Sequence, residues 1–259
     1  ASHGSSGRRA SAYFADGIPY GNPDRNLIRA MRTHWTIGGG DTLLLFFNGW
    51  GMDGGPTAHL ETGGFDVCIC CGYEDLTVDD STLARWKTYT RIKAAAWSMG
   101  VWAAERVLPA YGLMPERAIA LNGTPFPVDD RYGIPCAVAQ GTYENLSPQT
   151  LKKFYRRVFG GTAASEAAGA GFPAGALEER RRELGKILAA EEERRTENAG
   201  ETLRCGIRWN RAFVSRHDSI FPPGNLLAYW QGRCEVTLLD APHNPFACFK
   251  RWEEIVGEG

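Results

Sequence analysis

Residues 93–102 read KAAAWSMGVW and contain the pattern that decides the fold. An apolar run ends at Ser98, the small residues Ala96 and Gly100 stand two positions to either side, and a helical pattern follows at once. This arrangement is typical of a nucleophile elbow, a sharp strand-to-helix turn that exposes a serine hydroxyl, here with Ala96 in place of the usual first glycine. Small flanking residues are needed because the serine backbone is strained. An ordinary Ser-x-Gly turn after a strand fits the same pattern, so the rest of the chain must decide.

Short apolar runs and helical patterns alternate around this turn. We expect a helix in residues 99–111 and strands in residues 42–48, 65–71, 89–97, 117–121, 207–215 and 235–239. Short strands that are apolar throughout and separated by helices indicate a parallel sheet covered on both faces. The sequence therefore predicts an α/β fold with a mostly parallel central sheet.

The chain divides into an N-terminal arm and one domain. Residues 1–38 are rich in Gly, Ser, Pro and Arg, and we expect a poorly ordered arm there, followed by a single domain over 39–259. Residues 141–203 are polar and helical in pattern, and an insertion at this point of an open α/β sheet lies over the carboxyl ends of the strands. We therefore expect a helical lid, with a solvated charged face in 178–195 that forms i,i+4 ion pairs.

Composition excludes several classes of partner. The 259 residues are 43% hydrophobic with a net charge of -1, which argues against binding to nucleic acid or to an anionic membrane. No apolar run approaches the roughly 20 residues of a membrane helix, and the N-terminus lacks the apolar core of a secretory signal. The seven cysteines are expected to be buried free thiols in a reducing cytoplasm. No metal-ligand spacing or Walker-type loop occurs, so no metal or cofactor is expected.

Two further residues follow later strands in the order that serine hydrolysis requires. A serine nucleophile needs a base and a carboxylate that orients the base. Asp218 comes just after the strand in 207–215 and His243 just after the strand in 235–239, so both should emerge at the same sheet edge as Ser98. Serine, acid, histidine is the chain order of the α/β-hydrolase fold. We therefore expect Ser98 as nucleophile, His243 as general base and Asp218 as the orienting acid.

Other carboxylates and histidines leave alternatives open. Asp129 and Asp130 follow the strand in 117–121, where some hydrolases place the acid. His217 precedes Asp218 and falls outside the required order, so we expect it to form a local hydrogen bond. Asp240 is expected to shape the turn before the catalytic histidine.

Two backbone N–H groups should stabilise the oxyanion. One is that of Met99, the residue after the nucleophile, and the other should come from the loop in 48–53. We choose the N–H of Trp50, because Gly49 and Gly51 let the backbone approach a substrate closely. A plain glycine turn is the alternative interpretation of this loop.

Several short motifs together resemble one family. They are residues 47–52 (FNGWGM), 96–106 (AWSMGVWAAER), 122–124 (NGT), 133–135 (GIP), 141–146 (GTYENL) and 218–225 (DSIFPPGN). In order and spacing these motifs look like those of the BioG-type pimeloyl-acyl-carrier-protein methyl ester esterases. The likeness runs from about residue 43 to about residue 252, weakens in 160–200, and does not cover the first 35 or so residues.

The resemblance implies a carboxylesterase of biotin synthesis that acts on an acyl-carrier protein in the cytoplasm. By the family's pattern, Ser98, His243 and Asp218 are the catalytic residues. A basic cluster on the expected lid would suit an acidic carrier, although a solvated helix face fits it equally; the cluster comprises Lys152, Lys153, Arg156 and Arg157. A thioesterase or acyltransferase on another carrier-bound substrate, and a non-catalytic fold that binds a carrier protein, remain alternatives.

Overall fold

The computed structural model describes residues 30–161, 176–197 and 206–258. Within these ranges one sheet of seven strands has the order β1-β3-β2-β4-β5-β6-β7. The strands are β1 (Arg32–Thr36), β2 (Thr42–Phe47), β3 (Asp66–Cys71), β4 (Arg91–Trp97), β5 (Arg117–Leu121), β6 (Arg211–Ser215) and β7 (Glu235–Leu239). All neighbours pair in parallel except β1 and β3. The predicted mostly parallel sheet is therefore confirmed.

The central strands form the core because they are apolar on both faces. Every residue of β2 and of β3 is buried, as expected for strands that carry helices on each side. The register places Phe47 of β2 beside Ala96 of β4, and Trp97 beside Leu121 of β5. Three neighbouring strands thus end at the same level, next to Ser98.

Strand β1 corrects the expectation of a poorly ordered arm up to residue 38. Arg32–Thr36 pair with β3 in antiparallel register, with His34 beside Ile69. This strand is at the edge of the sheet and alternates exposed with half-buried residues, so its sequence has no continuous apolar run. Residues 1–29 of the expected arm lie outside the described residues.

Helices pack around the sheet. They are α1 (Asp80–Trp86), α2 (Gly100–Ala110), α3 (Cys136–Glu144), α4 (Pro148–Phe159), α6 (Ala176–Glu197), α7 (Pro223–Trp230) and α8 (Glu253–Val256), with short 3-10 turns at Gly55–Thr57 and Phe246–Cys248. Helix α2 packs on β2 and β4, and α8 packs on β4 and β5. Within the described ranges, no helix has both the length and the apolar character needed to cross a bilayer.

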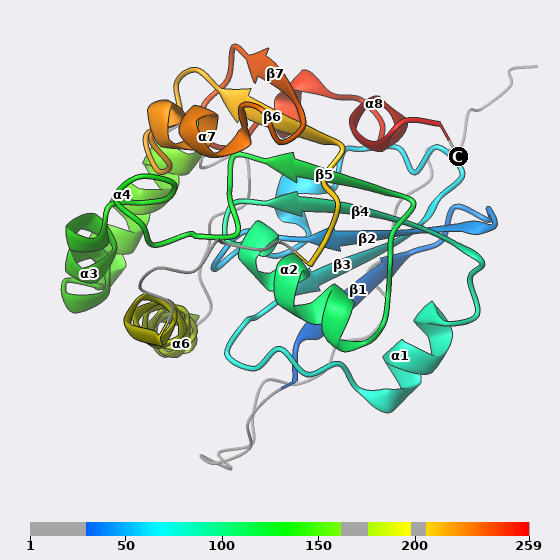
Figure 1. Ribbon diagram of the computed structural model, residues 1–259, viewed down its shortest axis with the longest axis horizontal. Coiled ribbons are helices and arrows are strands. Elements are labelled where there is room, and N and C mark those ends of the chain that lie inside the picture. The colour runs from blue at the N-terminus through cyan, green and yellow to red at the C-terminus, as the bar shows by residue number, and fades with distance from the viewer. Residues whose placement is uncertain (1–29, 162–175, 198–205, 259) are drawn as a thin grey trace, which may run out of the picture.

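Among the described residues between β5 and β6, helices α3, α4 and α6 form a separate group, which we call the cap helices. Figure 1 shows them side by side, beyond the carboxyl ends of β4 and β5. They contain the helical patterns expected in 141–203, of which 162–175 and 198–203 lie outside the described residues. The insertion therefore lies at the edge of the sheet where the candidate catalytic residues were expected.

Helix α6 has a buried face in addition to the solvated charged face that the sequence predicts. Glu183 is 3% exposed and Glu191 is 0% exposed. The intrahelical ion pairs that the structure shows have i,i+3 spacing, between Glu178 and Arg181, Glu191 and Arg194, and Glu192 and Arg195. The mixed charge of the sequence does not indicate this buried face. Glu183 and Glu191 can be buried because each accepts hydrogen bonds from residues on other elements.

All cysteines that the structure describes are free, in agreement with the sequence. Cys68, Cys70 and Cys71 are buried in β3, and Cys136 and Cys234 are half-buried. Cys248 is exposed, contrary to the expectation that all are buried, and Cys205 lies outside the described ranges.

Candidate active site

Ser98 occupies a strained turn between β4 and α2. Its φ of 59° lies in the left-handed region that residues other than glycine rarely adopt. A Cβ at Gly100 would lie 2.1 Å from the carbonyl oxygen of Phe47, so only glycine fits there. A Cβ at Gly123 would lie 2.1 Å from the carbonyl oxygen of Ser98. The need for glycine at position 100 agrees with the elbow pattern. The need for glycine at position 123 arises in the loop after β5 and could not be predicted from the sequence around Ser98.

The structure brings together the three residues expected from chain order. His243 Nε2 is 2.9 Å from Ser98 Oγ, and His243 Nδ1 is 2.7 Å from Asp218 Oδ2. All three residues are buried, with 2% of His243 exposed. Each follows the carboxyl end of a different strand, β4, β6 or β7, so the parallel sheet delivers them to one place. Such a chain of hydrogen bonds can move a proton from the hydroxyl to the imidazole.

Asp218 is fixed by the backbone that follows it. Its Oδ1 accepts hydrogen bonds from the N–H groups of Ile220 at 2.8 Å and Phe221 at 2.9 Å, which leaves Oδ2 directed at the imidazole. The Phe221 ring is parallel to the His243 ring, with 5.8 Å between centroids. The carboxylate and the imidazole are thus held in one orientation.

Asn122 and Trp97 hold the histidine loop. The carbonyl oxygen of His243 accepts hydrogen bonds from Trp97 Nε1 at 2.9 Å and from Asn122 Nδ2 at 2.8 Å. Asn122 also exchanges hydrogen bonds of 2.7 Å with Ser215 at the end of β6, and its own φ is 46°. The role of Asn122 could not be predicted from the sequence, because an Asn-Gly pair after a strand ordinarily marks a turn.

The alternative acids have other partners. Asp129 accepts from the N–H groups of Arg131 and Tyr132 at 3.0 Å, and Asp130 accepts from that of Cys136 at 2.8 Å. In the described part of the chain, Asp218 is the carboxylate that contacts His243.

His217 and Asp240 bond to each other. His217 Nε2 lies 2.7 Å from Asp240 Oδ1, and both side chains are largely exposed. This is the local hydrogen bond expected for His217.

The two expected oxyanion donors lie beside Ser98. Trp50 and Met99 are buried, and among the described residues neither backbone N–H donates a hydrogen bond. Both residues line the cavity that contains Ser98, as donors to an oxyanion must. A Cβ at Gly49 would lie 3.4 Å from Ser98 Cβ, so the loop in 48–53 approaches the serine closely.

Two adjoining cavities extend from Ser98. The first is lined by Gly49, Trp50, Met52, Trp97, Ser98, Met99, Ile134, Phe154, Val158, Ile220 and His243. The second shares part of this lining and continues among apolar side chains of the cap helices, including Val138 and Leu184, as far as Arg157. Arg157 and Ser219 also line an open groove on the surface. The lining residues thus connect the serine to the surface beside α4.

The basic cluster lies on the exposed side of α4. Lys152, Lys153, Arg156 and Arg157 are exposed, whereas Leu151, Tyr155 and Val158 are buried. Within the described residues none of the four forms an ion pair. Their charges are therefore available to a partner, and the side chains of Arg156 and Arg157 border the surface groove.

Several known proteins are similar to this chain in sequence or in structure. A protein of Bacteroides fragilis named malonyl-[acyl-carrier protein] O-methyltransferase is 42% identical over 201 residues, which cover 77% of this chain but 39% of that protein. A Haemophilus influenzae protein is 38% identical over 227 residues, 87% of this chain and 99% of its own length. The crystal structure of BioG from Haemophilus influenzae matches with a TM-score of 0.76 at 37% identity, covering 87% of this chain and 100% of that one.

More distant structures share only the fold. A thermophilic esterase from Thermogutta terrifontis is 16% identical with a TM-score of 0.58, covering 83% of this chain and 87% of that one.

The family described as pimeloyl-ACP methyl esterase BioG matches residues 31–255. The chain therefore belongs to the BioG family and has the α/β-hydrolase fold.

Proposed function

We propose that this protein is a serine carboxylesterase that hydrolyses the methyl ester of pimeloyl-[acyl-carrier protein] during biotin synthesis in the cytoplasm. One observation carries the proposal: the hydrogen-bonded chain of Ser98, His243 and Asp218 in a member of the BioG family. The proposed substrate follows from membership of the family, and the proposed type of reaction follows from the geometry of the three side chains.

The reaction is acyl transfer to serine and then to water. His243 accepts the proton of Ser98 as the hydroxyl oxygen attacks the ester carbonyl, and Asp218 stabilises the imidazolium. The N–H groups of Trp50 and Met99 donate to the oxyanion. Methanol leaves with the proton from His243, and water then releases the carboxylate by the same steps, so one ester and one water give one acid and one methanol.

The sequence of lining residues from Ser98 to the surface supports a long substrate that is bound at both ends. The methyl ester would lie in the cavity at Ser98, and the methylene chain would lie in the apolar cavity lined by Val138 and Leu184. The phosphopantetheine arm would then reach the surface groove beside Arg156 and Arg157, with the acidic carrier on the basic face of α4. Complementary charge mainly raises the rate of encounter.

The name of the Bacteroides fragilis relative does not carry over to this chain. The match covers 39% of that protein's length, so the methyltransferase activity in its name is not assigned to the matched region. Ester hydrolysis is the better proposal for this chain, since a hydroxyl paired with an imidazole is the arrangement that acyl transfer needs.

The direct test is complementation of a biotin auxotroph that lacks its own pimeloyl ester hydrolase. The wild-type chain should restore growth without biotin, and Ser98→Ala should not. Growth with Ser98→Ala, or no growth with a well-expressed wild-type chain, contradicts the proposal. A fluorophosphonate should label Ser98, whereas a non-catalytic carrier-binding fold would remain unlabelled.

A further inference from the structure

Helix α6 contacts the loop that carries the Trp50 N–H. Arg180 Nη2 donates to the carbonyl oxygen of Gly51 at 3.0 Å, and Arg180 Nε donates to the Tyr155 hydroxyl at 2.9 Å. The same hydroxyl donates to the carbonyl oxygen of Gly51 at 2.9 Å. Trp50 Nε1 in turn donates to the carbonyl oxygen of Arg180 at 3.0 Å. Two consecutive residues of the loop are thus bound to α6, one through its side chain and one through its backbone.

A buried carboxylate completes this attachment. Glu183 is 3% exposed and accepts a hydrogen bond from the N–H of Tyr73 at 2.8 Å. The Tyr73 hydroxyl in turn donates to the carbonyl oxygen of Asn48, in the same loop as Trp50, at 2.7 Å. Gly51 itself has a φ of 69°, and a Cβ there would lie 3.1 Å from Arg180 Nε, so the position favours glycine.

A second buried carboxylate attaches α6 to the helix that follows Met99. Glu191 is 0% exposed and accepts from Trp102 Nε1 at 2.9 Å and from Arg106 Nη2 at 2.9 Å, both on α2. It also accepts from Arg194 Nε at 3.0 Å within α6. Because α2 begins directly after Met99, α6 contacts both segments from which the two oxyanion donors come.

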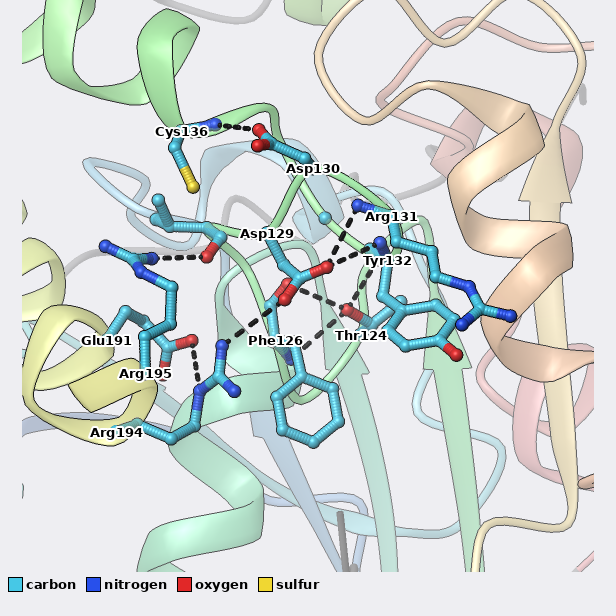
Figure 2. A network of polar contacts seen from close by, with 12 residues as sticks. Thr124, Phe126, Asp129, Asp130, Arg131, Tyr132, Cys136, Glu191, Arg194 and Arg195 are labelled. Atoms are coloured by element: carbon cyan, nitrogen blue, oxygen red, sulfur yellow. Dashed lines mark hydrogen bonds and ion pairs between the residues drawn. The ribbon is translucent and has the colours of Figure 1, made fainter. Parts of the chain in front are cut away.

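The C-terminal half of α6 is also bound to the loop after β5. Figure 2 shows Arg194 reaching Asp129, at 3.5 Å, and Arg195 donating to the carbonyl oxygen of Val128 at 2.8 Å. Asp129 is itself held by two backbone N–H groups of its own loop. The C-terminal half of α6 is therefore bound to a loop that is itself held in place by its own hydrogen bonds.

We propose that Arg180 and Glu183 are positioning residues, so that the Trp50 N–H points at the reacting carbonyl together with that of Met99. Arg180 holds the loop directly at Gly51, and Glu183 holds it through Tyr73. A carboxylate is rarely buried unless its hydrogen bonds are satisfied, and removing that of Glu183 would leave the Tyr73 N–H without this acceptor. The loop that contains Trp50 would then be free to shift. The inference rests on the proposed esterase chemistry, in which these N–H groups stabilise an oxyanion.

The test uses a short p-nitrophenyl ester, which needs no carrier protein. Glu183→Ala should lower kcat about tenfold to a hundredfold with an unchanged KM, less than the ~10²–10³ that deletion of a donor costs. Glu183→Gln, which retains one acceptor oxygen, should lose less. Arg180→Lys can replace only one of the bonds that Arg180 makes to Gly51 and to Tyr155, and its kcat should fall between those of the wild type and Arg180→Ala. Glu193→Ala, an exposed change on the same helix, is the matched control and should leave kcat unchanged.

A pair of inhibitors separates positioning from general loss of structure. A trifluoromethyl ketone forms a tetrahedral oxyanion on the serine, whereas the matched methyl ketone binds without one. The variants should lose affinity for the first by the same factor as kcat/KM, and should bind the second as the wild type does.

Equal kcat values, or equal losses of affinity for the two ketones, would overturn the inference. If Glu183→Ala does not fold, Glu183→Gln and Arg180→Lys decide the same question. A wild-type protein whose ester hydrolysis does not depend on Ser98 would overturn the proposed function first, and the inference with it.

Discussion

Ser98 depends on two glycines that leave no room for a side chain. At Gly123 an added Cβ would lie 2.1 Å from the carbonyl oxygen of Ser98 and 2.8 Å from its Cα. Backbone atoms cannot move aside as a flexible side chain can, so the turn itself would have to shift. The position of the serine hydroxyl is thus determined partly by a residue 25 positions later in the chain.

Gly123→Ala should therefore slow the labelling of Ser98 by a fluorophosphonate by more than tenfold and destabilise the fold by about 1–3 kcal/mol. Gly141→Ala in α3 is the matched control, because its Cβ meets nothing within 4 Å; it should leave labelling unchanged and raise stability by about 0.5–1 kcal/mol. The test is the labelling rate of each variant, measured well below the melting temperatures of both Gly123→Ala and Gly141→Ala. Wild-type labelling of Gly123→Ala would mean that the serine turn tolerates this contact.

Asp218 and Asp130 offer a comparison between two acids that the sequence left open. Asp218→Asn should lower kcat by about 10³–10⁴, since the amide favours the wrong imidazole tautomer. Asp130→Asn should keep nearly full activity, because its carboxylate bonds to the backbone of Cys136. Steady-state hydrolysis of a short ester measures both, and a larger loss at Asp130 would transfer the role of the acid to that residue.

At the scale of elements, strands with continuous apolar runs could be predicted and amphipathic or short elements could not. Strands β2 to β7 all fall within the predicted ranges, although β6 starts at Arg211 instead of residue 207. Strand β1 was missed because it is a half-exposed edge strand. The buried face of α6 was missed because Glu183 and Glu191 read as solvated charges, and only their partners on other elements reveal why they can be buried.

Glu183 should give the free energy of unfolding a specific pH dependence. Burial is the main cause that raises the pKa of this carboxyl above its ordinary value of 4.5. Between that value and the raised pKa, the folded protein binds more protons than the unfolded chain, so its contribution to stability falls as pH rises. Glu183→Gln lacks this group and should gain stability relative to the wild type as pH rises from about 4.5. Denaturant unfolding across pH tests this, with Glu193→Gln as the exposed control; parallel curves for the wild type and Glu183→Gln would refute it.

The basic face of α4 should affect the carrier substrate alone. Reversing charge with Lys152→Glu and Arg156→Glu should lower kcat/KM for the carrier-bound ester about tenfold at low salt, through the rate of encounter, and the difference should shrink as salt rises. Hydrolysis of a short ester should not change, because both side chains are exposed and lie away from Ser98. Equal losses on both substrates would assign these residues to the fold of α4 instead of to docking.

At the scale of the whole molecule, the parallel sheet explains how much of the site the sequence could predict. Ser98, Asp218 and His243 each follow a strand, and parallel strands end at a common edge, so their meeting could be predicted without coordinates. Asn122 and Arg180 could not be found in this way, because their roles depend on contacts with residues 93 and 129 positions away. The pattern of strands predicts the candidate catalytic residues, whereas the residues that hold them in place can be identified only from packing.

The mass of the carrier protein after reaction tests the central claim most directly. Pimeloyl-[acyl-carrier protein] methyl ester is incubated with the wild-type chain and with Ser98→Ala, and the intact carrier is weighed by mass spectrometry. The wild type should convert the methyl ester to the free acid while the acyl chain stays on the carrier, and Ser98→Ala should leave the substrate unchanged. A carrier returned to its free thiol would identify a thioesterase, and conversion by Ser98→Ala would contradict the assignment of the serine.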